Sequence, residues 1–272
     1  MAVTDKTPAV PKAGPGREEE FILVLQEVTK RFGGLVAVDA ATFNVKRGEV
    51  FALIGPNGAG KTTLFNSITG LFPPTSGSIA FDGVEIAGLK PHQVAALGIA
   101  RTFQNVRLFD YMTAIDNVRL GQHCRMRAKL WDSMFKTRFE RQEEKRTTER
   151  ARELLKFVGI ERFTHSYARN LPYGQQRRLE IARALATDPR LLLLDEPAAG
   201  FTPQEKAELM ELVAKVLSMG ITVFLIEHDM KVVMGISKRI VVLDHGEMIA
   251  EGSPEEVRHN HRVIEAYLGK GA

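Results

Sequence analysis

The sequence predicts an α/β fold, in which helices cover a parallel sheet, a small β-rich part precedes that sheet, and a helical segment is inserted into it. Three observations predict this fold class. Strand and turn patterns fill residues 21–54, helical patterns occupy about residues 101–170, and helices alternate with short apolar runs after residue 170. With 272 residues, of which 44% are hydrophobic and 26% charged, the chain has the composition of a globular protein with a full core.

The N-terminal part predicts strands. The run FILVLQEV at residues 21–28 indicates one strand. The run ATFNVKRGEVFALIG at residues 41–55 indicates two more, joined by a turn at residues 46–48. These strands predict a small β-rich beginning.

A helix and a hairpin are expected next. Residues 62–72 carry apolar side chains at helical spacing, and Gly70 with two prolines at positions 73 and 74 supplies the stop. Asp82-Gly83 then stands between two short alternating segments, which is a strong signal for a two-residue hairpin.

The middle of the chain predicts a helical insertion at about residues 101–170. Residues 138–159 indicate a charged helix that has four apolar residues on one face and ends at Gly159. Across residues 119–150, ten Lys or Arg stand against five Asp or Glu. A solvated helical face and a partner surface both explain this basic excess.

Beyond residue 170, helices alternate with buried strands, a pattern typical of a parallel sheet covered by helices. Helices are expected at residues 174–186 and 203–220, strands at 190–197 and 221–227, and a hairpin at 239–252. A capping box at Ser253 and Glu256, with Pro254 at the first helical position, starts a last helix.

The bulk properties restrict the class of protein. Residues 1–20 lack the apolar segment of a secretory signal and predict a disordered tail, which favours the cytoplasm. The apolar runs are far shorter than the roughly 20 residues of a membrane-spanning helix. Cys124 is the single cysteine, so the chain has no internal disulfide. The net charge of +4 permits a nucleic-acid or anionic membrane partner, but Lys and Glu are balanced, which argues against a dedicated nucleic-acid surface.

The segment GPNGAGKTT predicts a phosphate-binding loop. It fits the pattern G-x-x-x-x-G-K-[ST], follows the apolar strand VFALI and opens a helix. Its glycines let backbone N–H groups close around the phosphates of a nucleotide at the helix N-terminus. Lys61 is expected to reach the β- and γ-phosphates, Thr62 to offer its hydroxyl to Mg²⁺, and Thr63 to extend the phosphate contacts. The expected nucleotide ligands are Gly55, Pro56, Asn57, Gly58, Ala59, Gly60, Lys61, Thr62 and Thr63.

The segment LLLLDEP predicts the acidic part of the same site. Its four leucines indicate a buried strand, which delivers Asp195 and Glu196 to the carboxyl edge where ligands bind in α/β sheets. Asp195 suits the Mg²⁺ shell, and Glu196 is placed to polarise an attacking water. Taken alone, such a pair can also be structural.

Three single residues are ambiguous by themselves. His228 follows the strand ITVFLI and emerges at the same edge, although a lone histidine is more often structural. Gln104 stands at the start of the inserted segment. Phe32 precedes Gly33-Gly34, where an aromatic residue is usually part of the core.

Read together with the phosphate loop, the acidic pair and the segment LPYGQQRRLEIARAL, these residues resemble the ATP-binding cassette of ABC transporters over nearly the whole chain. The resemblance implies a P-loop NTPase (ABC ATPase) core with an N-terminal antiparallel β subdomain and an inserted α-helical subdomain. It implies that Phe32 stacks on adenine, that Gln104 senses Mg²⁺ and links to a membrane subunit, and that His228 contacts the γ-phosphate.

The resemblance also implies that Gly174 and Gln175 complete the ATP site of a second cassette in a head-to-tail dimer. Here the sequence departs from the family pattern Leu-Ser-Gly-Gly-Gln, because Pro172 and Tyr173 replace its second and third residues. Pro172 removes a hydroxyl and a backbone N–H that could meet the γ-phosphate. Thr202 stands where the family commonly has an aspartate, in the loop that the resemblance places at the contact between the two cassettes.

The segments RTFQNVRLF, DEPAAG, IEHDMKVVMGIS and VIEAYLG look like those of the ATPases of high-affinity branched-chain amino acid importers, and importers of other hydrophobic amino acids, amides or urea are the alternative. The resemblance implies a cassette at residues 21–253, with the helical subdomain at about 101–170, and a C-terminal helical extension at 254–272. It implies ATP and Mg²⁺ as ligands and a location at the cytoplasmic face of the membrane. The expected partners are two permease subunits, a second cassette and a substrate-binding protein.

The mechanism expected from this resemblance is closure of two cassettes around two ATP molecules, followed by hydrolysis through Glu196 that lets them part. Two other classes of function are weighed against it. A soluble cassette that acts on nucleic acid usually has two cassettes or a long coiled coil, and this chain has neither. A regulatory subunit with an inactive site is disfavoured by the intact Lys61, Asp195 and Glu196.

Overall fold

The structure is a computed structural model that describes residues 20–122 and 138–268. Nearly all of the expected N-terminal tail, Cys124, part of the basic segment 119–150 and the last four residues of the expected C-terminal extension lie outside these described residues. Within them, no helix combines the length and the apolar character needed to cross a membrane.

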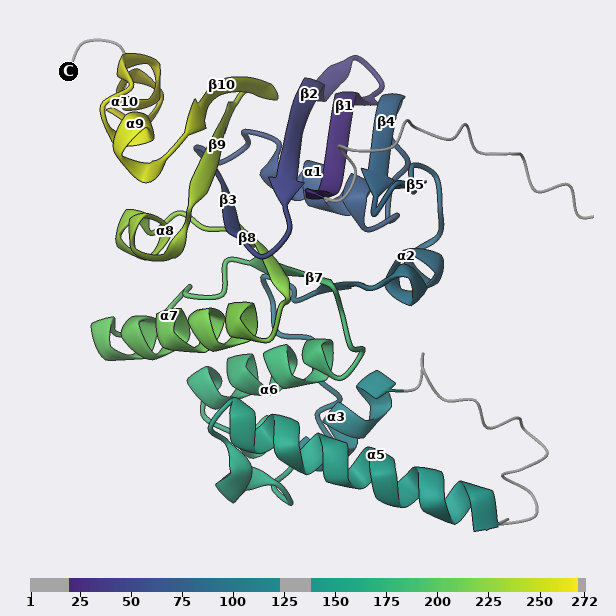
Figure 1. Cartoon of the computed structure of the whole chain (residues 1–272). Coiled ribbons are helices and arrows are strands. Elements are labelled where there is room, and N and C mark those ends of the chain that lie inside the picture. Colours follow the sequence, from purple (N-terminus) through teal and green to yellow (C-terminus); the bar gives the residue numbers. More distant parts are fainter. Residues whose placement is uncertain (1–19, 123–137, 269–272) are drawn as a thin grey trace, which may run out of the picture.

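The strands and helices follow the predicted order of β-rich start, helical insertion and alternating α/β end (Figure 1). The strands are β1 (Phe21–Phe32), β2 (Leu35–Lys46), β3 (Val50–Ile54), β4 (Ser76–Phe81), β5 (Val84–Glu85), β6 (Ile99–Arg101), β7 (Leu191–Asp195), β8 (Thr222–Ile226), β9 (Arg239–Asp244) and β10 (Glu247–Gly252). The helices are α1 (Lys61–Ile68), α2 (Pro91–Leu97), α3 (Ala114–Gly121), α5 (Arg138–Phe157), α6 (Tyr173–Leu185), α7 (Pro203–Ser218), α8 (Met230–Ile236), α9 (Pro254–Arg258) and α10 (His261–Leu268).

An antiparallel sheet forms the N-terminal subdomain, with the strand order β2-β1-β4-β5. Strand β1 pairs with β2 on one side and with β4 on the other. The hairpin between β4 and β5 turns at Asp82 and Gly83, both of which have positive φ, 53° and 75°. This confirms the predicted two-residue turn, since a turn of this kind requires positive φ at both central residues.

A six-stranded sheet with the order β10-β9-β3-β8-β7-β6 forms the second layer. Strands β9, β3, β8, β7 and β6 are parallel neighbours, and only β10 at one edge pairs antiparallel. The carboxyl ends of β3, β8 and β7 therefore meet at one edge of this sheet, where the loops that follow them lie side by side.

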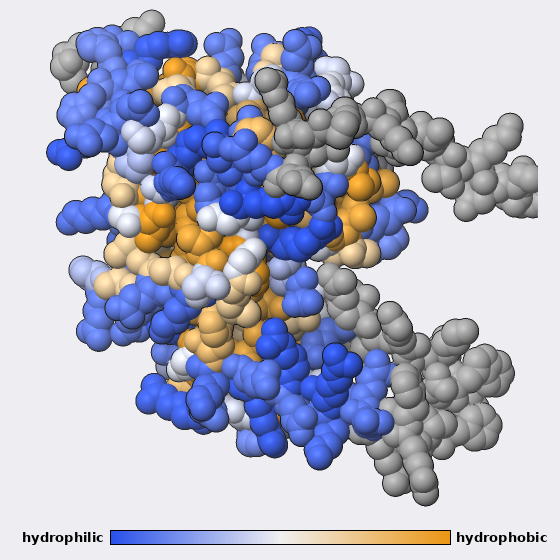
Figure 2. Space-filling model, viewed as in Figure 1, coloured by the Kyte–Doolittle hydropathy of each residue, from blue (hydrophilic) through white to orange (hydrophobic). Residues whose placement is uncertain are grey.

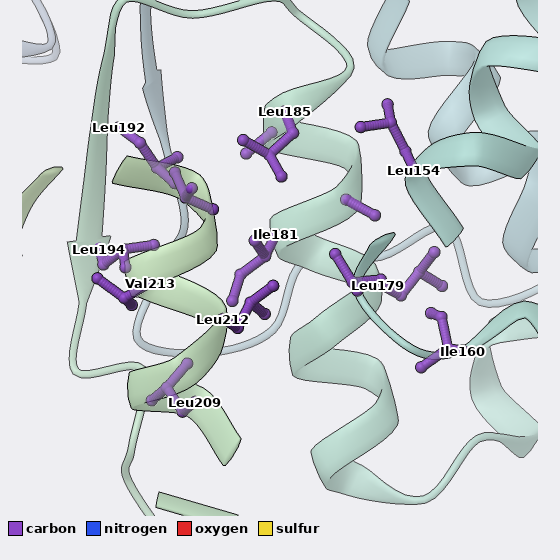
Figure 3. Close-up of a cluster of buried hydrophobic side chains, with 14 of the residues drawn as sticks. Leu154, Ile160, Leu179, Ile181, Leu185, Leu192, Leu194, Leu209, Leu212 and Val213 are labelled. Carbon is purple, nitrogen blue, oxygen red and sulfur yellow. The ribbon is translucent and has the colours of Figure 1, made fainter. Parts of the chain in front are cut away.

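Alternate side chains of β7 belong to the apolar clusters on opposite faces of the sheet. Leu191 and Leu193 pack with α1 and the antiparallel sheet, whereas Leu192 and Leu194 pack with α6 and α7. Figure 3 shows the second group, in which the β7 leucines face apolar side chains of α7 and α6. This period of two, with both faces covered, explains why the strand is an unbroken run of leucine.

Phe224 on β8 joins the layers beneath the phosphate loop. Its ring centroid lies 4.8 Å from that of Phe65 on α1, 5.1 Å from Phe51 on β3 and 5.9 Å from Phe43 on β2, each in an edge-to-face arrangement. Edge-to-face contacts add to the stabilisation that burial gives. The start of α1, and with it the loop, is thereby anchored to both sheets.

Helices α3 and α5 of the inserted segment form a helical lobe with α6, the next helix of the chain, at one end of the molecule (Figure 1). Three of the four apolar residues predicted on one face, Ala151, Leu154 and Leu155, lie on α5, and Val158 lies in the turn just after it. All four are buried in the lobe, and Gly159 follows with φ of 79°, which confirms the predicted stop. Figure 2 shows hydrophilic side chains over the outer side of this lobe and apolar ones mainly in the middle of the face in view.

The structure corrects one helix boundary. The helix expected at residues 62–72 is α1, which ends at Ile68, and Leu71 lies beyond it with 46% of its surface exposed. Gly70 ends the helix because its φ is 74° and a Cβ there would lie 2.3 Å from the carbonyl oxygen of Leu89. The elements α2, β6 and α8 are additions that the sequence patterns did not specify, whereas α10 lies in the stretch expected as a helical extension.

Replacing Phe224 tests the anchoring of the loop. We expect Phe224→Ala to lower the free energy of unfolding by about 3–5 kcal/mol and Phe224→Leu by about 1–2 kcal/mol, because the cavity left behind differs in size. Urea denaturation measures both values. The control Phe109→Leu changes a ring that is half exposed and should stay within about 0.5 kcal/mol. Equal stability of Phe224→Ala and the unchanged protein would contradict this role of the ring.

Candidate functional site

The predicted phosphate loop, residues 55–63, connects β3 to α1 at the carboxyl edge of the sheet. Two of its glycines are required by close backbone contacts. A Cβ on Gly55 would lie 2.1 Å from the carbonyl oxygen of Leu243, and a Cβ on Gly60 would lie 2.3 Å from that of Ala37. Both have positive φ, 151° and 101°. The loop thus has a fixed backbone path that ends at the N-terminus of α1, as an anion-binding loop requires.

Lys61 places a buried positive charge at this loop. Its Nζ donates hydrogen bonds to the carbonyl oxygens of Gly55, at 2.7 Å, and Pro56, at 2.9 Å. Burial lowers the pKa of Lys61, and the nearby carboxylates of Glu196 and Asp195 oppose that change. The ammonium group is therefore poorly solvated, and the phosphates of a nucleotide would supply the negative charge that favours its protonated form.

Asp195 ends β7 in a buried ion pair that the sequence patterns did not indicate. Arg101 Nη2 donates to Asp195 Oδ2 at 2.7 Å, and both side chains are almost fully buried. Nη1 of Arg101 donates to Asn66 Oδ1 at 2.7 Å on α1. Arg101 thus holds the acidic strand end of β7 against the helix that follows the phosphate loop.

Glu196, Gln104 and His228 come together from three separate segments. Nε2 of Gln104 donates to Glu196 Oε2 at 2.9 Å, and Nδ1 of His228 lies 3.7 Å from the same oxygen. Glu196 has a positive φ of 48°, which is uncommon outside glycine, and its backbone N–H donates to the carbonyl oxygen of Ile226 at 2.9 Å. Such backbone conformations are enriched at functional sites.

Glu227 is a second residue that sequence reasoning missed. Its carboxylate is fully buried and accepts backbone hydrogen bonds from Ala198 at 2.8 Å, from His228 at 2.9 Å and from Asp229 at 3.2 Å. Ala198 lies after β7, whereas His228 and Asp229 lie after β8. One carboxylate therefore fixes the two loops that carry Glu196 and His228 relative to each other.

Gly174 and Gln175 lie on a different element, the first turn of α6 in the helical lobe. Gly174 faces α7, because a Cβ there would lie 2.8 Å from Glu205 Oε1. Thr202, the residue found in place of the family's aspartate, is the N-cap of α7. It forms a capping box with Glu205 and so keeps the capping function that an aspartate could serve.

Phe32 lies at the end of β1 and is 43% exposed. Its ring contacts the ring of Phe72 edge to face at 5.7 Å, and Lys30 Nζ lies 5.0 Å from the Phe32 ring centroid. The structure thus places this aromatic side chain at the surface, where a base could stack on it, rather than in the core.

Family models match two parts of the chain. A model described as ABC transporter matches residues 38–199, and one described as branched-chain amino acid ATP-binding cassette transporter matches residues 247–272. The chain is 50% identical over 250 residues to the high-affinity branched-chain amino acid transport ATP-binding protein BraF of Pseudomonas aeruginosa. It is 46% identical over 250 residues to the LivG protein of Escherichia coli, which has the same description. Each alignment covers 92% of this chain and 98% of the relative.

Solved structures have the same fold. The ADP conformation of an ATP-binding cassette of an ABC transporter is 31% identical, with a TM-score of 0.79, and the alignment covers 92% of this chain and 99% of that one. A dimeric post-hydrolysis cassette bound to ADP and Pi is 30% identical, with a TM-score of 0.73, and the alignment covers 85% of this chain and 98% of that one. These similarities confirm the predicted fold class.

Glu227 should contribute strongly to stability. Glu227→Ala is expected to lower the free energy of unfolding by about 3 kcal/mol, because three backbone N–H groups lose their buried acceptor. Glu227→Gln should lower the free energy of unfolding by about half as much, since the amide carbonyl oxygen can still accept hydrogen bonds from the backbone. Urea denaturation measures both, with the exposed Glu211→Ala as the control within about 0.5 kcal/mol. A Glu227→Ala protein as stable as the unchanged chain would refute this account of the buried carboxylate.

Proposed function

The chain belongs to the ATP-binding proteins of ABC transporters, and on that premise we propose that it is the ATP-hydrolysing subunit of a high-affinity importer of branched-chain amino acids. The names of its relatives and the match of its last residues, 247–272, to a branched-chain amino acid family model support this substrate class over other amino acids, amides or urea. The single structural observation that carries the activity is the hydrogen bond from Gln104 to Glu196, beside a loop built to hold phosphates.

Glu196 is the general base of this proposal. Gln104 donates to Oε2, so Oε1 is the oxygen that takes the proton from the attacking water. His228 lies beside the same carboxylate, and its role in this proposal is to contact the γ-phosphate. Lys61 and the loop amides hold the β- and γ-phosphates, and Phe32 supports the adenine ring. Gly55, Pro56, Asn57, Gly58, Ala59, Gly60, Thr62 and Thr63 complete this nucleotide site.

Mg²⁺ is the expected metal, held by Thr62 and Asp195 with Gln104 at its shell. When bound, it neutralises charge on the phosphate oxygens. The residues fit a magnesium ion because such ions are usually held by one or two protein groups plus substrate phosphates. Among the described residues, no cluster of three His, Cys, Asp or Glu side chains offers an all-protein metal site instead.

We propose that residues 21–253 form the cassette, that residues 101–170 are its inserted helical subdomain, and that residues 254–272 are a C-terminal extension. Two cassettes then close head to tail around two ATP molecules, with Gly174 and Gln175 of one facing the nucleotide of the other. A dimeric cassette among the similar solved structures supports this arrangement. Closure moves the permease subunits, and hydrolysis lets the cassettes part.

A pocket beside Gln104 supports docking of a permease subunit at the cytoplasmic face of the membrane. Its volume is about 370 Å³, and it lies between α2 and β6 of the core and α3 and α6 of the lobe. Its lining is mostly apolar and includes Leu71 and Phe109, which are both about half exposed. An exposed apolar pocket of this kind fits an apolar side chain from a partner. The substrate-binding protein belongs to the same transport system on the other side of the membrane.

Replacing the base tests the proposed function. Glu196→Gln should lower kcat for ATP hydrolysis by at least about 100-fold, because general-base catalysis contributes that much, while ATP affinity stays within about threefold. Phosphate release and titration with a fluorescent ATP analogue measure the two effects. Lys61→Ala is the converse control, which should lose ATP binding. Hydrolysis at the normal rate by Glu196→Gln, or normal affinity of Lys61→Ala, would show that the site is assigned wrongly. Uptake of labelled leucine, amide or urea by reconstituted vesicles identifies the substrate class.

Replacing an apolar residue of the pocket tests the docking. Phe109→Asp should abolish co-purification with the permease subunits, because a charged side chain would be buried without a partner. The free energy of unfolding should change by less than about 0.5 kcal/mol, since this ring is half exposed. The control Val84→Asp changes an exposed apolar residue of β5 outside the pocket and should co-purify normally. Normal recovery of the permease with Phe109→Asp would rule out this docking surface.

A further inference from the structure

Tyr173, one of the two residues that depart from the family pattern, binds a buried arginine. Its hydroxyl oxygen accepts hydrogen bonds from Arg177 Nε at 3.0 Å and from Arg177 Nη2 at 2.7 Å. The residue is 46% exposed, and its ring contacts that of Phe201, in the loop before α7, edge to face with centroids 6.4 Å apart. Tyr173 thus touches both the interior of the lobe and the surface at the start of α6.

Arg177 also binds the backbone of the segment that contains Gln104. Its Nη1 donates to the carbonyl oxygen of Phe103 at 2.7 Å, and its Nη2 also donates to the carbonyl oxygen of Gln104. Glu180, one turn further along α6, accepts from the backbone N–H of Phe103 at 3.2 Å and of Arg107 at 3.4 Å. The side chains of Arg177 and Glu180 are both almost fully buried and lie 3.5 Å apart.

These contacts form a continuous path to the proposed catalytic base. The Arg177 guanidinium donates both to the Tyr173 hydroxyl and to the backbone carbonyl oxygen of Gln104. The side-chain amide of Gln104 then donates to Glu196 Oε2 at 2.9 Å. A planar guanidinium with several donors in a fixed fork transmits a change in orientation better than a flexible ammonium would. The buried hydrogen bonds of Arg177 fix the direction of the peptide segment that carries Gln104.

We propose that Tyr173 is a positioning residue for hydrolysis, which acts through Arg177 to hold the side chain of Gln104 on Glu196. Although Tyr173 departs from the family pattern, its hydroxyl gives this chain a link that the pattern's glycine could not form. The link connects the surface turn at the start of α6 to Glu196, the base of the same chain. A partner that presses on Tyr173 shifts Gln104 and so changes the hydrolysis rate. The inference rests on the proposed function, since it needs Glu196 to be the base.

Tyr173→Phe tests the path because it removes the hydroxyl and keeps the ring against Phe201. We expect kcat of the full-length protein to fall about fivefold with KM for ATP within about twofold, because only the orientation of Gln104 is lost. Tyr167→Phe is the matched control. It removes a hydroxyl from another half-exposed tyrosine of the lobe, one that is not among the partners of Arg177, and kcat should be unchanged.

A double-mutant cycle separates positioning from a general structural effect. In a Gln104→Ala background, Tyr173→Phe should have no further effect on kcat, because the path no longer reaches Glu196. A second readout is the side-chain amide signal of Gln104 in the NMR spectrum of ¹⁵N-labelled protein, assigned by its loss in Gln104→Ala. This signal should shift in Tyr173→Phe and stay in place in Tyr167→Phe.

The inference is overturned if Tyr173→Phe has the kcat of the unchanged protein, if its fall in kcat is the same in the Gln104→Ala background, or if the Gln104 amide signal does not move. Failure of the proposed function has a different signature. In that case Glu196→Gln hydrolyses ATP at the normal rate, whatever the Tyr173 variant does.

Discussion

The parallel pairing of β3, β8 and β7 is the constraint on which the site depends. Val50 pairs with Val223, and Thr222 pairs with Leu191, so the three strands run in step and end at one edge. The phosphate loop, the acidic pair and His228 each follow one of these strands. Segments that are far apart in the sequence are thus brought to one edge, and the segment after β6 adds Gln104 beside Glu196. The hydrogen bonds of Glu227 then hold two of these loops in one arrangement.

The sequence predicted elements whose signal is local. The leucine run of β7, the Asp82-Gly83 hairpin and the capping box at Ser253 are each defined by neighbouring residues, and the structure has all three. It did not specify β6, because three residues between Gly98 and Thr102 are too short for a pattern. That strand exists because it pairs with β7 and completes the edge of the sheet. The stop at Gly70 was predicted as well, but the spacing of apolar residues wrongly placed Leu71 on the helix, because α1 already ends at Ile68.

The site residues likewise divide into those with a local sequence signal and those that only distant contacts reveal. The glycines and lysine of the phosphate loop form a motif because one short segment must meet several phosphate oxygens. Arg101 and Glu227 have no such motif. Glu227 stands beside His228 at the end of an apolar strand, where a carboxylate would ordinarily be solvated, and its partner Ala198 is 29 residues away. Arg101 is 94 residues from Asp195. A charged residue of this kind can be identified only when the fold shows that it is buried and which groups it pairs with.

The Arg177–Glu180 pair adds buried polar contacts between the lobe and the segment of Gln104. The chain leaves β6 after Arg101, so the N–H and carbonyl groups of Phe103 lose the ladder of the sheet, yet buried backbone groups need partners. Two residues three apart on α6 lie on one face of the helix and supply a donor and an acceptor to that peptide segment. Apolar residues would fill the same volume without fixing the direction of the backbone. Because these bonds are directional and buried, a shift of α6 must either carry Gln104 with it or break several bonds at once, which makes the position of the lobe a determinant of the geometry at Glu196.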